Sequence, residues 1–121
     1  MMANIELEED RMIECREYTR TPVDLLVSFS VTDTTDMREG TMFDLSARGC
    51  AVTSMSSVQS GSAVRIFIKA TGLGSPITIE AAAVRWTGGG EFGVEFLGLS
   101  EIDRRRLDRL LQTAMDSTQS N

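Results

Sequence analysis

The chain has 121 residues, 41% hydrophobic and 25% charged, a balance typical of one globular domain with a packed core. Its net charge of −6, from 12 basic and 18 acidic residues, argues against broad binding to nucleic acid or to an anionic membrane surface. The chain contains no histidine, and Cys15 and Cys50 lack CxxC spacing, so no metal site is expected. Both cysteines are expected to be reduced thiols, and a disulfide between them is the alternative. Any anion site must therefore be local and specific.

Residues 1–14 are predicted to form an acidic, flexible leader. The first ten residues hold four acidic side chains and no basic one, which differs from the basic start of a signal peptide. No apolar run in the chain approaches the roughly 18 to 20 residues that a membrane-spanning helix needs. We therefore expect a cytoplasmic protein without a membrane partner.

A pair of arginines, Arg16 and Arg20, lies four positions apart just before Pro22, which disfavours a long helix through this segment. On a loop, two planar guanidinium groups can converge on one ligand. Each can bind a phosphate bidentately or contact the O6 and N7 edge of a guanine. The alternative is a solvated mixed-charge segment without a ligand.

Six short strands are predicted after this pair. Over residues 23–31, hydrophobic residues alternate with mostly polar ones, as in a strand with one buried face, and the Thr-, Asp- and Gly-rich residues 32–40 predict a turn. Glycine- and proline-rich breaks separate the other strands, expected at 41–45, 50–53, 63–69, 77–86 and 92–97. Such a series favours a small antiparallel barrel, because closure removes unpaired strand edges.

A second polar motif, Asp44-Leu45-Ser46-Ala47-Arg48-Gly49, falls where one predicted strand ends and the next begins. Asp44 and Ser46 share one face of the strand. A carboxylate can accept hydrogen bonds from the N1–H and amino group of guanine, a serine hydroxyl can add a contact, and Gly49 allows a close turn. The alternative is an ordinary side-chain-capped turn.

A helix is predicted from Ser100, which forms a capping pattern with Asp103. Leu107, Leu110, Leu111 and Ala114 fall on one face, so the helix should cover one side of the barrel. The polar residues 116–121 have nothing to bury and are expected to be a disordered tail.

Together, the RxxxR pair, the DxSxxG motif, the strand-rich middle and the final helix resemble the PilZ domain family over residues 15–115. The resemblance implies a mainly β fold, a six-stranded antiparallel barrel of the split-barrel type with a C-terminal α-helix. It also implies a cyclic di-GMP site in which Arg16 and Arg20 hold phosphates and guanines, and Asp44, Ser46 and Gly49 contact a guanine. Residues 84–86 and 93–96 are similar to the last two strands of the family.

The sequence departs from the family directly before RxxxR, where Cys15 stands in place of a frequent arginine. In similar proteins this departure goes with one bound cyclic di-GMP rather than a pair, although Arg11 or Arg48 could compensate. Cys15, Arg48 and Arg85 are possible secondary ligand contacts, and the alternative for the two arginines is a solvated surface role. Trp86 either stacks on a guanine or fills the barrel or the helix contact.

The sequence therefore predicts a cyclic di-GMP receptor that changes the conformation of its N-terminal loop on binding and signals to a downstream protein. No cofactor is expected. The protein is expected to be a monomer, although the sequence leaves the oligomeric state open. The alternative is a PilZ-like adaptor that binds proteins but no nucleotide. An oligonucleotide-binding barrel fits poorly, because only 6% of residues are aromatic. No catalytic motif of a known class is present, so an enzyme is not expected.

Overall fold

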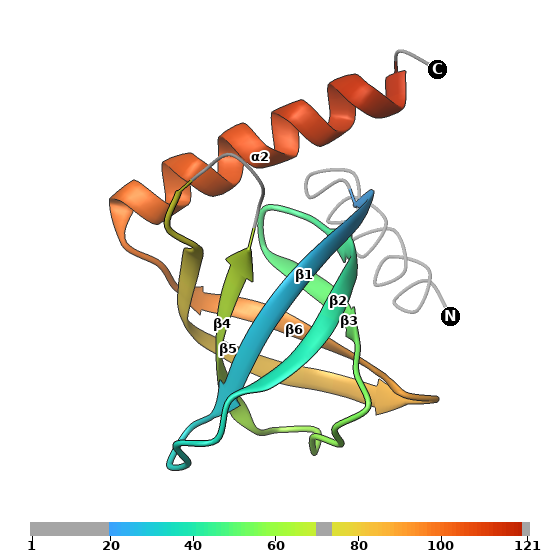
Figure 1. Cartoon of the computed structure of the whole chain (residues 1–121), viewed down its shortest axis with the longest axis vertical. Helices are drawn as coiled ribbons and strands as arrows, with labels where there is room; N and C mark the ends of the chain where they lie inside the picture. Colours follow the sequence, from blue (N-terminus) through green and yellow to red (C-terminus); the bar gives the residue numbers. More distant parts are fainter. Residues whose placement is uncertain (1–19, 70–73, 120–121) are drawn as a thin grey trace, which may run out of the picture.

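The computed structural model describes residues 20–69 and 74–119, which form a closed antiparallel barrel and one helix (Figure 1). Around the barrel the strands follow the order β1-β2-β3-β6-β5-β4, and β4 pairs with β1 to close it. This confirms the predicted six-stranded barrel with a C-terminal helix. The elements are β1 (Thr21–Val31), β2 (Arg38–Leu45), β3 (Gly49–Thr53), β4 (Ala63–Lys69), β5 (Ile77–Gly88), β6 (Glu91–Gly98) and α2 (Glu101–Gln119).

The core of the barrel follows from the alternation of side chains along each strand. In β6, for example, Phe92, Val94 and Phe96 are buried, while Glu91 and Leu97 are exposed. Inside the barrel, Phe92 meets Phe29 of β1 edge to face, with ring centroids 5.1 Å apart. The alternation in β6 therefore leaves the face with Glu91 and Leu97 on the surface.

Helix α2 lies across one end of the barrel, where it contacts β1 and β5 (Figure 1). Leu107 and Leu111 are buried and belong to the same core cluster as the barrel residues. At the helix start, the hydroxyl of Ser100 accepts the backbone N–H of Asp103 at 3.1 Å, as the capping pattern predicts.

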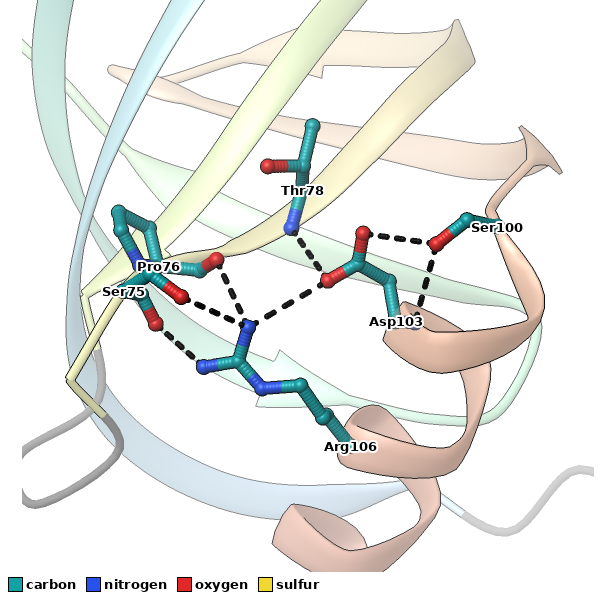
Figure 2. Close-up of polar contacts among 6 residues, drawn as sticks. All are labelled: Ser75, Pro76, Thr78, Ser100, Asp103 and Arg106. Atoms are coloured by element: carbon teal, nitrogen blue, oxygen red, sulfur yellow. Dashed lines mark hydrogen bonds and ion pairs between the residues drawn. The ribbon is translucent and has the colours of Figure 1, made fainter.

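A polar network fixes the first turns of α2 on the start of β5 (Figure 2). Asp103 accepts a hydrogen bond from the backbone N–H of Thr78 at 3.3 Å and forms an ion pair with Arg106 at 3.6 Å. Arg106 also donates to the carbonyl of Pro76 at 3.1 Å and to the carbonyl of Ser75. The helix is thus tied to the barrel by polar as well as apolar contacts.

Two boundaries differ from the sequence analysis. The backbone is helical to Gln119, four residues past Met115, where a disordered tail was expected. Residues 116–119 contain no glycine or proline, and extending an existing helix costs far less than starting one. Strand β2 starts at Arg38, so Gly40 lies in a strand and not in the predicted turn. A side chain there would meet the carbonyl of Thr53.

Within the described residues, no helix has both the length and the apolar character needed to cross a bilayer. The same part of the chain contains no group of three or more His, Cys, Asp and Glu side chains that could hold a metal ion.

Candidate functional site

A hollow of about 360 Å³ opens on the outer wall of the barrel, over β3, β6 and β5. We call it the outer hollow. Its volume lies within the range of small-molecule sites, roughly 300–1,000 Å³. Three arginines and one glutamate line it, so this part of an acidic protein carries a local excess of positive charge. The lining residues are Arg20, Ser46, Arg48, Gly49, Cys50, Arg85, Trp86, Gly93, Val94 and Glu95.

The corner between β2 and β3 forms one side of the outer hollow. The hydroxyl of Ser46 accepts the backbone N–H groups of Arg48 and Gly49, each at 3.2 Å, and the N–H of Ser46 donates to the carbonyl of Gly49 at 2.9 Å. Helix α2 supports the corner from behind, because Arg104 donates to the carbonyl of Ala47 at 2.7 Å. Ser46 is 7% exposed, so its hydroxyl first of all shapes the turn.

Gly49 is required at this corner by close packing. A Cβ atom built on Gly49 would lie 2.3 Å from the backbone carbonyl oxygen of Val94 on β6. No side chain fits there without separating the two strands. The glycine of the DxSxxG motif therefore has a structural reason that is independent of any ligand.

Arg20 and Asp44 join the two sequence motifs at this place. Arg20 directly precedes β1, and its guanidinium donates to the carboxylate of Asp44 on β2 at 2.9 Å. The Arg20 side chain is 63% exposed and that of Asp44 is 23% exposed. Arg20 lines the outer hollow, whereas Asp44 lies beside it and reaches it through this ion pair.

A β-bulge in β5 supplies the opposite side. Val84 pairs with Val94 and Trp86 pairs with Gly93, so Arg85 is an extra residue between them. In a regular strand Arg85 and Trp86 would face opposite sides, but here both are exposed on the outer wall. Trp86 is 40% exposed and covers Gly93, where an added Cβ would lie 2.1 Å from the indole nitrogen. Trp86 therefore does not fill the barrel, which corrects that part of its predicted packing role.

The structure thus brings together most of the predicted site. Arg20, Ser46 and Gly49 line the outer hollow, as do the possible secondary contacts Arg48, Arg85 and Trp86. Arg16 and Cys15 lie outside the described residues. Ligand contact by each of these residues stays a prediction.

Cys50 is a free, buried thiol among the described residues. It also lines the outer hollow. Burial raises the pKa of this thiol far above its ordinary value, the charge of nearby Asp44 raises it further, and Arg20 opposes the rise. A neutral, unreactive thiol follows.

Sequence reasoning missed Glu95 as a residue of the site. Its side chain accepts two hydrogen bonds from Arg85, from Nε at 2.9 Å and from Nη2 at 2.6 Å, both on the same oxygen. The available signal was the alternation in β6, which places Glu95 outward between the core residues Val94 and Phe96.

A second, smaller hollow of about 240 Å³ lies between the loop after β3 and the β5–β6 hairpin. Its lining residues include Glu91 but no arginine or lysine. It offers no cation to a phosphate, so the outer hollow is the better candidate for an anionic ligand.

The fold and the outer hollow define a small antiparallel barrel with an arginine-lined surface site. The model of the PilZ domain matches residues 14–113, and the chain belongs to this family. PilZ domains are receptors for cyclic di-GMP and catalyse no reaction. A comparison with curated proteins gives no match.

Solved structures of PilZ domains share the fold. The PilZ domain of CeSA from a cellulose-synthesising bacterium is 20% identical, with a TM-score of 0.60 over 75% of this chain and 92% of that one. The PilZ domain of YcgR from Escherichia coli, solved with c-di-GMP, is 17% identical, with a TM-score of 0.61. The match covers 87% of this chain and 95% of the YcgR domain.

The inhibitor of motility MotI/DgrA from Bacillus subtilis is 23% identical, with a TM-score of 0.67 over 88% of this chain. The present chain covers 52% of the MotI/DgrA chain, about half its length. At these identities the likeness concerns the fold.

Proposed function

We propose that this PilZ domain binds cyclic di-GMP in the outer hollow and passes the signal to a protein partner. The observation that carries the proposal is the convergence of Arg20, the Asp44 carboxylate and the Ser46–Gly49 corner beside one arginine-lined hollow. Membership of the PilZ family supports the choice of ligand.

The chemistry of the hollow suits a cyclic dinucleotide. Its two phosphates need cationic donors, which Arg20, Arg48 and Arg85 offer. Its guanines present N–H donors, for which Asp44 is an acceptor. Trp86 offers an exposed aromatic face on which a base can stack.

The ion pair between Arg20 and Asp44 does not block this binding. A surface pair of this kind contributes about 0–1 kcal/mol, because water screens the largely exposed Arg20. A charge-assisted hydrogen bond to a ligand contributes about 1.5–3 kcal/mol. Exchanging the internal pair for ligand contacts is therefore favourable, and until then the pair holds both groups near the hollow.

The length of the chain allows Arg16 to contact the same ligand. It precedes Arg20 by four residues, and a fully extended chain spans at most about 3.6 Å per residue, or about 14 Å here. A ligand bound by both arginines fixes the segment between them against the barrel. We take this as the conformational change that a protein partner detects.

The test is calorimetric titration of cyclic di-GMP into the wild type and into Arg16→Ala, Arg20→Ala and Asp44→Asn. Each change should weaken binding by about 1.5–3 kcal/mol, roughly 10- to 150-fold, because it removes a charged hydrogen-bonding group. One site per chain is the expected stoichiometry.

Matched controls are Arg65→Ala on β4 and Asp24→Asn on β1, which are exposed and do not line the outer hollow. Both should bind as the wild type does. Equal affinity in all variants would refute the site. No binding by the wild type would favour the alternative, an adaptor that binds proteins without a nucleotide.

A further inference from the structure

Glu95 has an unusual position for a carboxylate. It is the one acidic side chain in the lining of the outer hollow, as far as the described residues go. Its neighbours across the sheet are Gly49 on β3 and Ala83 on β5, which have no side chain or only a methyl group. Nothing bulky in these neighbours covers Glu95, and its side chain is 37% exposed. A negative charge here repels a phosphate. Its presence in the hollow therefore needs another explanation.

The partner of Glu95 is Arg85, which the bulge in β5 directs to the same surface. Both hydrogen bonds from Arg85 end on one carboxylate oxygen, Oε1. The second oxygen, Oε2, has no hydrogen bond to the described residues. The pair therefore presents a carboxylate acceptor and guanidinium donors side by side, next to the exposed face of Trp86.

Stability is a weak reason for this pair. The Arg85 side chain is 56% exposed and that of Glu95 37%, and exposed pairs contribute little to folding. A surface ion pair would also stabilise the fold equally well at a place away from the outer hollow. The arrangement has a clearer chemical use if a base lies in the hollow.

We propose that Arg85 and Glu95 form a guanine-recognition pair, an inference that rests on the proposed binding of cyclic di-GMP. Glu95 accepts hydrogen bonds from the N1–H and amino group of a guanine, and Arg85 donates to its O6 and N7 atoms. Trp86 stacks on the base. Adenine has no amino group at C2 and presents an unprotonated N1 to the carboxylate, and its own amino group lies at C6, where Arg85 needs an acceptor. Glu95 therefore determines specificity for guanine, while Asp44 is available to the second base.

The experiment compares cyclic di-GMP with cyclic di-AMP, which has the same ring and phosphates but carries adenines. Affinities for both are measured with the wild type, Glu95→Gln and the control Glu91→Gln, an exposed residue of the same strand. Glu95→Gln should weaken cyclic di-GMP binding about tenfold or more and leave or improve cyclic di-AMP binding, because one guanine-specific contact is lost. Glu91→Gln should keep the wild-type ratio.

Thermal unfolding of both variants should match the wild type, since surface substitutions of this kind rarely change stability. If Glu95→Gln keeps the wild-type ratio of the two affinities, or weakens both nucleotides equally, the guanine assignment is wrong while cyclic di-GMP binding stands. If the wild type binds neither nucleotide, the proposed function fails and this inference with it.

Discussion

Replacing Gly49 by alanine tests the close contact at the corner of the site. The new Cβ atom would lie 2.3 Å from the carbonyl oxygen of Val94, and real Cβ atoms keep at least 3.0 Å. The strands β3 and β6 must therefore separate by at least 0.7 Å at this point, the difference between the two distances. This movement strains the adjacent hydrogen bond from the N–H of Phe96 to the carbonyl of Arg48, which is 2.7 Å long.

The cost can be estimated from these two effects. Overpacking of a tight site costs about 1–3 kcal/mol, and a weakened backbone hydrogen bond adds up to about 1 kcal/mol. The lower entropy of the unfolded alanine chain offsets about 0.4–1 kcal/mol. A net loss of about 1–3 kcal/mol lowers the Tm of a domain of this size by roughly 5–20 °C.

The assay is thermal unfolding followed by circular dichroism, with Gly88→Ala as the control. Gly88 ends β5, and nothing lies within 4 Å of a Cβ atom built there. Its replacement should change stability by no more than about 0.5 kcal/mol. Equal melting temperatures for the two variants would refute the steric argument for Gly49.

Two further predictions concern the contact of Arg104 with the corner of the site and the pH dependence of stability at Cys50. Arg104→Ala, which removes the hydrogen bond to the carbonyl of Ala47, should weaken cyclic di-GMP binding more than Arg105→Ala, whose side chain pairs with Glu101 of its own helix. Equal calorimetric affinities would contradict this prediction. Because burial raises the pKa of Cys50 in the folded chain, the unfolded chain loses that proton first, so the free energy of unfolding should fall as pH rises above about 9. Denaturant titrations should show a shallower fall in Cys50→Ala, and identical slopes would rule this out.

Much of the fold could be predicted because its signals are local. The alternation of Val27 and Phe29 with mostly polar neighbours marks a half-buried strand, and Ser100 with Asp103 marks the helix start. The two motifs of the site also fall at strand boundaries that glycine and proline make visible. Their meeting at one place required the family resemblance, since 24 residues separate Arg20 from Asp44.

The rest of the site depends on events that short patterns do not record. The bulge that turns Arg85 and Trp86 to the same face breaks the alternation from which faces are inferred. Glu95 reaches the outer hollow because β6 lies between β3 and β5, and the pairing of β6 with β3 joins distant parts of the chain. The contact of Arg104 with Ala47 spans 57 residues and depends on where the helix lies on the barrel.

The most direct test of the account is a nuclear magnetic resonance titration with cyclic di-GMP. Trp86 is the only tryptophan in the chain, so its indole N–H gives a single, assignable signal in the outer hollow. We predict that this signal and the amides of Gly49 and Gly93 shift on addition of the nucleotide, while residues 54–58 around the smaller hollow do not. An unchanged spectrum at excess ligand, or shifts confined to residues 54–58 and 87–91, would contradict the assignment of the site.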